Sequence, residues 1–239
     1  MYGWRARIGL LIPSPNTTME PEFNQVVPEG VSVHAERMIH IWKEKEDLNE
    51  AVSMMNKDML RAASTVATIE PNIIVYGCTG GSMLKGIGFD LQQSRLIQEN
   101  TGIKAITTST AVMSAFKKMG IKKVVVATPY IKKLNEFEKA FLEGNGFQVL
   151  NIKGLGLLPI RIGDKYPHEA YRLAKEVDLP NADGIFISCT DFRTIEIIDM
   201  LEQDLSKPVI TSNQATIWYT LINLGISKKI KGYGELFLK

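Results

Sequence analysis

Two patterns of apolar and polar positions alternate along the chain. Short apolar runs are separated by longer segments in which apolar residues recur at helical spacing, and this order is typical of an α/β protein with parallel sheets. The apolar runs predict strands at residues 7–12, 31–36, 72–76, 104–106, 123–127, 147–152, 184–188 and 208–210. The periodic segments predict helices at residues 17–25, 48–70, 91–100, 110–119, 131–142, 167–177, 194–204 and 214–224.

The second half of the chain repeats the first. The segment 106–111 (ITTSTA) parallels 210–215 (ITSNQA), LIP at 11–13 parallels ATP at 127–129, and Glu22-Phe23 and Glu136-Phe137 lie on the helices that follow. Such internal similarity indicates a duplicated unit. We therefore predict two pseudo-symmetric α/β lobes, each a mainly parallel four-stranded sheet flanked by helices, with the active site in the cleft between them. Residues 1–108 and 214–239 are expected to form the first lobe and residues 109–213 the second.

Two cysteines, the total for the chain, occupy equivalent places in this repeat. Cys78 follows the apolar run IIVYG, and Cys189 follows IFIS, 111 residues later (189 − 78). The ligand crevice of an open α/β sheet lies outside the carboxyl ends of its strands, so both thiols are expected there. A single cysteine in such a place would more often be a buried core thiol. Two thiols facing one small substrate favour proton transfer or thiolate attack without a metal or a cofactor.

The residues after each cysteine predict how its thiol is activated. Cys78 precedes TGGS, a segment whose backbone N–H groups can converge on an anion, so we expect its pKa to be lowered. Thr190 adjoins Cys189, and Arg193 follows one helical turn later. The Arg193 guanidinium is placed to stabilise the second thiolate or to bind a substrate carboxylate.

Two further polar residues follow the first strand of each half. Asn16 lies in the loop PSPNTT, where it would cap the next helix, donate its amide to a substrate carboxylate, or do both. Tyr130 follows Thr128-Pro129 at the equivalent place, where its ring would cover the core or its hydroxyl would donate to a carboxylate or enolate oxygen. Asp191 and Glu20 are the carboxylates nearest to the expected crevice, and each suits a base or a partner for a helix N-terminus.

Composition limits the class of partner. The net charge is +2 with Lys and Arg spread along the chain, so we expect neither a nucleic-acid nor a membrane-binding surface. The first ten residues carry two arginines and no apolar signal segment, which makes the cytoplasm, with reduced cysteines, the expected location. His34, His40 and His168 have no metal-ligand spacing. His34 and His40 flank a strand and a polar stretch that ends in residues 42–47, and this stretch is expected to be a solvated connection. A homodimer is expected because dimers are the commonest state of symmetric enzymes.

Four segments identify a family. They are GLLIPSPNTTME at 9–20, YGCTGGS at 76–82, TPY at 128–130 and SCT at 188–190. With them the chain resembles, over nearly its full length, the maleate cis-trans isomerase and arylmalonate decarboxylase branch of the aspartate/glutamate racemase superfamily. Decarboxylases of this branch keep only the second-half cysteine, so the presence of Cys78 argues against that activity.

The resemblance implies a role for each cysteine. In maleate isomerases the first-half cysteine, here Cys78, adds to the carbon–carbon double bond, and the second, here Cys189, protonates and deprotonates the neighbouring carbon. Backbone N–H groups after each cysteine would stabilise the enediolate-like charge. The residues expected to contact the substrate are Asn16, Tyr130, Thr79, Gly80, Thr190 and Arg193.

The chain departs from the family pattern at two places. Pro159 stands where the family usually has an asparagine, and DFRT at 191–194 replaces residues that are apolar in maleate isomerases. The leading hypothesis is a cofactor-independent cis-trans isomerase of a small dicarboxylate, with maleate as the first candidate. The alternatives are an amino-acid or hydroxy-acid racemase that uses the two cysteines as acid and base, and a non-catalytic ligand-binding relative.

Overall fold

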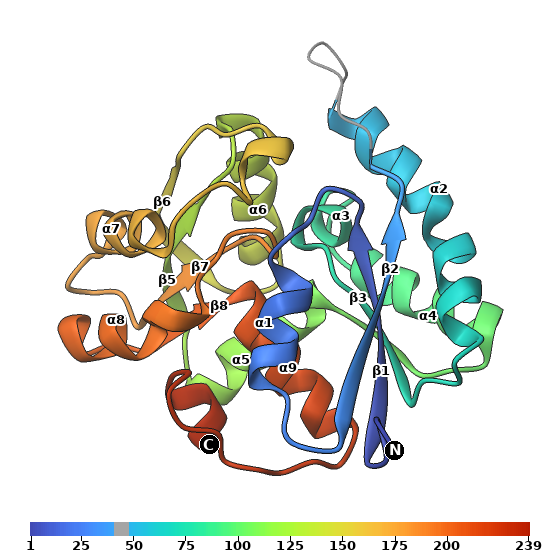
Figure 1. Ribbon diagram of the computed structural model, residues 1–239. Coiled ribbons are helices and arrows are strands. Elements are labelled where there is room, and N and C mark those ends of the chain that lie inside the picture. Colours follow the sequence, from blue (N-terminus) through green and yellow to red (C-terminus); the bar gives the residue numbers. More distant parts are fainter. Residues whose placement is uncertain (41–47) are drawn as a thin grey trace.

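Two four-stranded parallel sheets form the framework of the computed structural model, which describes residues 1–40 and 48–239 (Figure 1). The first has the order β2-β1-β3-β4, with β1 at Ala6–Pro13, β2 at Val31–Met38, β3 at Ile73–Tyr76 and β4 at Ala105–Thr107. The second has the equivalent order β6-β5-β7-β8, with β5 at Lys123–Thr128, β6 at Gln148–Gly154, β7 at Gly184–Ile187 and β8 at Val209–Thr211. Neighbouring strands pair in parallel in both sheets, which confirms the predicted two-lobed α/β fold.

Helices connect successive strands, as parallel pairing requires. They are α1 (Met19–Val26), α2 (Leu48–Ala67), α3 (Thr79–Met83), α4 (Phe89–Thr101), α5 (Thr108–Met119), α6 (Lys132–Gly144), α7 (Pro167–Val177), α8 (Ile198–Leu205) and α9 (Ser212–Asn223). Short 3-10 segments lie at η1 (Pro159–Arg161), η2 (Ile195–Ile197) and η3 (Glu235–Leu238). The sequence did not predict α3, because five residues that include two glycines show no helical period. The helix expected at 194–204 begins as η2 and becomes α-helical at Ile198.

The lobes meet along α5 and α9, which pack against each other at the centre of the molecule (Figure 1). The central strands are apolar because helices cover both of their faces. Phe116 on α5 is fully buried and makes edge-to-face contacts with Phe147 and Phe186. A smaller cluster lies between α2 and the first sheet. The exact residue boundary between the lobes, set above at 108/109 and 213/214, stays a prediction.

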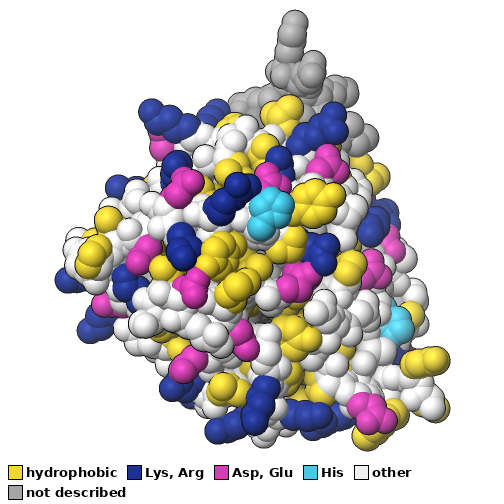
Figure 2. Space-filling view, turned by 60° about the vertical axis from the view of Figure 1, so that its left-hand side comes forward, with side chains coloured by type: hydrophobic (Ala, Val, Ile, Leu, Met, Phe, Trp, Pro, Cys, Tyr) yellow, Lys and Arg dark blue, Asp and Glu magenta, His cyan; other side chains and the backbone are white. Residues whose placement is uncertain are grey.

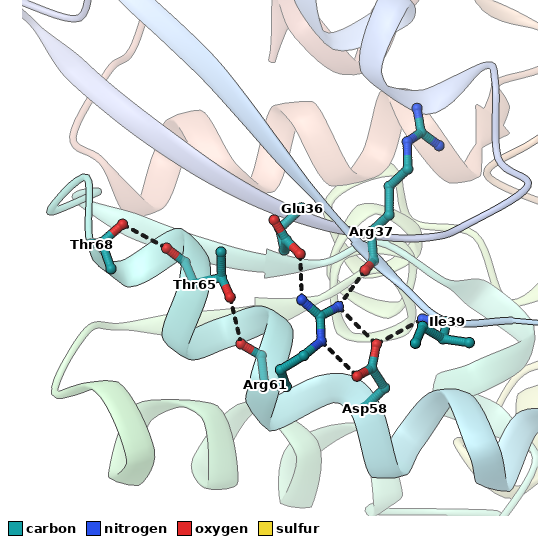
Figure 3. Close-up of polar contacts among 7 residues, drawn as sticks. All are labelled: Glu36, Arg37, Ile39, Asp58, Arg61, Thr65 and Thr68. Atoms are coloured by element: carbon teal, nitrogen blue, oxygen red, sulfur yellow. Dashed lines mark hydrogen bonds and ion pairs between the residues drawn. The ribbon is translucent and has the colours of Figure 1, made fainter.

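A charged network fixes α2 against the end of β2 (Figure 3). The Arg61 guanidinium donates to Glu36 Oε1 (2.6 Å), to the Arg37 carbonyl (2.7 Å) and to both oxygens of Asp58 (2.7 and 2.8 Å). Asp58 also accepts the Ile39 N–H at 2.8 Å. The Arg61 hydrogen bonds lower the pKa of Asp58, so the network persists at neutral pH. The network thereby fixes the carboxyl end of β2 against α2.

Charged side chains of both signs are interspersed on the face shown in Figure 2. Within residues 1–40 and 48–239, no helix is long and apolar enough to cross a membrane. The solvated connection predicted at 42–47 lies outside the described residues.

Candidate active site

A pocket of about 660 Å³, including its open mouth, lies where β1, β3, β5 and β7 end at their carboxyl termini. This is the expected place for a ligand in an α/β sheet, and the volume suits a small molecule. Its walls are formed by Pro13, Pro15, Asn16, His40, Met55, Cys78, Thr79, Gly80, Gly81, Tyr130, Leu134, Leu157, Pro159, Ile162, Cys189, Thr190 and Asp191. Both cysteines and five of the six residues expected to contact the substrate are in this lining. The sixth, Arg193, is not among them.

Cys78 is the N-cap residue of α3, directly after β3. Its Sγ accepts a hydrogen bond from the Gly81 N–H at 3.2 Å. A Cβ added to Gly81 would lie 2.3 Å from Tyr76 Oη and 3.1 Å from Cys78 Sγ, so this turn requires glycine. The N–H groups of Thr79 and Gly80, in the first turn of α3, have no acceptor within the helix and lie beside the thiol.

Cys189 is held in a more constrained backbone conformation. Its φ is +98°, a region that residues with side chains rarely adopt and that costs on the order of 1–3 kcal/mol. The Cys189 N–H donates to Ser212 Oγ at 3.0 Å, and its Sγ accepts from the Asp191 N–H at 3.4 Å. These contacts from α9 and from the following turn aim the second thiol into the pocket.

The predicted lowering of the Cys78 pKa is wrong for the free protein. Burial raises it to about 11, and the single Gly81 N–H offsets only part of that effect. Burial also raises the pKa of Cys189, and the negative charge of Asp191 raises it further. The hydrogen bond from the Tyr130 hydroxyl lowers this pKa but does not cancel the two effects. The sequence shows which N–H groups follow a cysteine, but it does not show how completely the fold removes the thiol from water.

Three polar residues predicted to bind substrate also join the two lobes. Asn16 Oδ1 accepts from Thr18 N (3.0 Å) and Met19 N (2.9 Å), which makes it a cap of α1, while Nδ2 donates to Thr190 Oγ1 at 3.0 Å. The Thr190 hydroxyl donates to the Gly77 carbonyl (3.2 Å). The Thr79 hydroxyl donates to Ser212 Oγ (3.0 Å). Both threonine hydroxyls therefore donate their hydrogen bonds to other groups of the protein, and toward a ligand they can act only as acceptors.

Tyr130 lies between the second-lobe core and the pocket. Its ring is 5% exposed and belongs to the main hydrophobic core, and its hydroxyl is hydrogen-bonded to Cys189. Burial raises its pKa well above the ordinary value, so the phenol stays protonated. The ring covers the core, which is one of the two predicted roles, and the hydroxyl is a donor beside the second thiol. Its donation to a substrate oxygen stays a prediction.

Arg193 does not fulfil either predicted role. Its guanidinium ion-pairs with Glu196 and is more than half exposed, so it neither stabilises the thiolate nor lines the pocket. The turn that follows Cys189 directs Asp191 toward the pocket and Arg193 outward. Residues that sequence reasoning missed are His40, expected on a solvated connection, and Ser212, which contacts both halves of the site. The repeat ITTS/ITSN pointed to Ser212, because it sits at the equivalent strand end.

Comparison with known proteins places this chain in a family. The arylmalonate decarboxylase (Amdase) family model matches residues 8–237. A maleate isomerase from Geobacillus stearothermophilus is 24% identical over 245 residues, covering 96% of both chains, and an arylmalonate decarboxylase from Bordetella bronchiseptica is 30% identical over 168 residues, covering 66% of this chain and 68% of that one. A structure of Nocardia farcinica maleate cis-trans isomerase, a mutant with a covalently bound succinylcysteine intermediate, superposes with a TM-score of 0.89 at 22% identity, covering 97% of this chain and 98% of that one.

The chain belongs to the arylmalonate decarboxylase family, as its sequence motifs predict. Within it, the chain is maleate isomerase-like, since maleate isomerases of several species match it over almost their whole length.

Proposed function

We propose that the protein is a cofactor-independent cis-trans isomerase of a small dicarboxylate, with maleate as the first candidate substrate. The observation that carries this proposal is the pair of cysteines, delivered by equivalent strand ends into one pocket and each accepting a backbone N–H. The similarity to maleate isomerases, and the succinylcysteine in the Nocardia structure, support a covalent route.

The reaction starts from a site in which one of the two thiols has lost its proton. The Cys78 thiolate adds to one alkene carbon, so that an S–C bond forms and the π electrons move toward the neighbouring carbon and its carboxylate. Cys189 gives its proton to that neighbouring carbon and becomes the thiolate. After rotation about the new single bond, Cys189 takes the proton back and Cys78 leaves with the S–C electron pair, which restores the double bond in the trans geometry.

Hydrogen-bond donors lie where negative charge develops in this reaction. The N–H groups of Thr79 and Gly80, which have no acceptor within α3, are beside Cys78, and the Tyr130 hydroxyl is beside Cys189. Asn16, which belongs to the first-lobe side of the pocket, donates to the hydroxyl of Thr190 on the second-lobe side. These groups hold one substrate carboxylate and stabilise its enediolate form without a metal or a cofactor.

The test is to incubate the protein with maleate in deuterated buffer and to follow it by proton NMR, together with a panel of chiral amino and hydroxy diacids. We expect fumarate to appear from maleate. Loss of α-proton signal from a chiral diacid, without fumarate formation, would show a racemase. Asp191 beside Cys189 is the observation that keeps a racemase as the second candidate.

Gly80 provides an independent test of where the substrate lies. A Cβ added here meets no atom within 4 Å, and its φ is not positive, so Gly80→Ala is compatible with the fold. The methyl group would occupy pocket space beside Cys78, and we expect maleate turnover to fall by about tenfold or more, as one misplaced group in a tight site can cause. Thermal unfolding and initial rates check this.

Gly81→Ala is the matched control for Gly80→Ala. Its Cβ would lie 2.3 Å from Tyr76 Oη, so this variant should lose stability as well as activity. Unchanged turnover in a stably folded Gly80→Ala protein would place the substrate elsewhere.

A further inference from the structure

The pocket carries a negative charge of its own. Asp191, on the turn after Cys189, lines the pocket and is 8% exposed. Its Oδ1 accepts the Thr17 N–H at 2.7 Å and lies 3.5 Å from the Thr17 hydroxyl. Thr18 contributes further hydrogen bonds to the same carboxylate. Gly163 lies against this carboxylate, since a Cβ added there would be 3.1 Å from Oδ2, so no side chain covers it from that direction.

The rest of the lining offers little positive charge to balance Asp191. Among the described residues of the pocket wall there is no lysine or arginine, and the titratable groups that share the pocket with Asp191 are His40, Cys78, Tyr130 and Cys189. Elsewhere the wall is largely apolar, with three prolines, Met55, Leu134, Leu157 and Ile162. One carboxylate finds donors beside the cysteines. A second carboxylate near Asp191 would meet a like charge in a partly desolvated space.

We infer that Asp191 selects substrates with one carboxylate and a neutral, hydrogen-bond-donating second group, such as the half-amide of maleate, over the dicarboxylate dianion. This inference rests on the proposed isomerase chemistry at Cys78 and Cys189. It changes the preferred substrate from the maleate dianion, which is the first compound to test, to a monocarboxylate with a neutral second group. The Asp191 carboxylate has about four acceptor sites, so it can accept a further hydrogen bond from an amide N–H of the ligand, whereas it repels a carboxylate. The half-amide passes through the same addition and elimination at Cys78 and Cys189, because its double bond is conjugated to a carbonyl at both ends.

Burial gives this selection a pH dependence. Desolvation raises the pKa of Asp191 to about 6, against the opposing hydrogen bonds from Thr17 and Thr18. The carboxyl is therefore largely neutral near pH 5 and charged near pH 8, and its discrimination against a dianion increases over that range. Maleate loses its own second proton with rising pH, so the informative comparison is between the parent and Asp191→Asn at each pH.

The experiment measures binding and turnover with matched ligand pairs. Succinate and its half-amide bind without reacting, and their Kd values are measured by calorimetry near pH 5 and pH 8; maleate and its half-amide give kcat/KM. For the parent near pH 8 we expect the half-amide to be preferred by about ten- to a hundredfold, the size of one like-charge contact at intermediate dielectric. Asp191→Asn retains an oxygen for Thr17 N–H and should reduce or reverse this ratio, chiefly at the higher pH.

Asp164→Asn is the matched control, because it removes an exposed carboxylate that pairs with Arg161 outside the pocket. Its ligand ratio should equal that of the parent. If Asp191→Asn weakens both ligands of a pair equally, Asp191 only joins the lobes through Thr17 and the inference is overturned. The inference is also overturned if the parent prefers the dianion near pH 8. If neither unsaturated compound is isomerised but the succinate pair shows the expected ratios, the selectivity stands and the proposed isomerase function fails.

Discussion

Cys78→Ser is expected to abolish cis-trans isomerisation while leaving the fold intact. A serine hydroxyl is a far weaker nucleophile than a thiolate, and removal of a covalent nucleophile typically costs about three orders of magnitude or more in turnover. Cys78 is the N-cap of α3, where its Sγ accepts the Gly81 N–H, and serine is a preferred residue at this position. The melting temperature should therefore be equal to or above that of the parent. Proton NMR of maleate turnover checks the loss of isomerisation, and thermal unfolding checks the melting temperature.

Cys189→Ser is the informative partner of this variant. In Cys189→Ser, water or the serine hydroxyl must give the neighbouring carbon its proton, and no thiolate is present to take that proton back. The variant should therefore accumulate a covalent adduct on Cys78. Intact-protein mass spectrometry with maleate should show it, and the Cys78→Ser protein should show none. Full turnover in Cys78→Ser would rule out the covalent mechanism, and an adduct located on Cys189 would reverse the two roles.

Glu138→Gln is expected to stabilise the protein at alkaline pH. Glu138 on α6 is 1% exposed, and neither carboxyl oxygen has a hydrogen-bond partner in the part of the chain that the structure describes. Burial raises its pKa from 4.5 to about 8, and the nearby Ser188 hydroxyl offsets only part of that effect. A neutral acid is what this site accommodates, and glutamine has the same shape without the charge.

The direction of the pH dependence follows from proton binding. Between pH 4.5 and 8 the unfolded chain has released the Glu138 proton that the folded chain retains. The contribution of this group is therefore fully present below pH 4.5 and is lost as the pH rises through 8. In the fully charged state the loss amounts to a few kcal/mol, so Glu138→Gln should match the parent near pH 5 and melt roughly 5 °C or more above it near pH 9.

Glu22 is the matched control, because it is the counterpart of Glu138 in the first lobe. Each lies nine residues after a strand-end proline (22 − 13 and 138 − 129), and both are buried. Glu22 accepts Thr194 N, Ile195 N and Asn213 Nδ2 at 2.6–3.1 Å. In Glu22→Gln the remaining oxygen can still accept Thr194 N and Ile195 N, but the amide N–H₂ would face the donor Asn213 Nδ2. The substitution should therefore destabilise the protein at neutral pH. Equal melting of Glu138→Gln and parent at every pH would contradict the assignment.

The sequence by itself determined the fold and the two cysteines. Apolar runs of strand length and the ITTS/ITSN repeat predicted two equivalent parallel sheets, because buried central strands must be apolar and a duplicated unit repeats its pattern. The position of Cys78 and Cys189 directly after such strands placed both thiols in one crevice, since the carboxyl ends of parallel strands form it. The same rule placed Asn16 and Tyr130 at the pocket, because each lies directly after the first strand of its half.

Only the tertiary structure decided the charges and directions within the site. Burial is a property of the packed lobes, and it turned the expected low pKa of Cys78 into a high one. The positive φ at Cys189 and the turn after it sent Arg193 outward to Glu196 and left Asp191 on the pocket wall. Local sequence cannot specify these outcomes, because each depends on groups brought from distant parts of the chain, such as Thr17, Gly163 and Ser212.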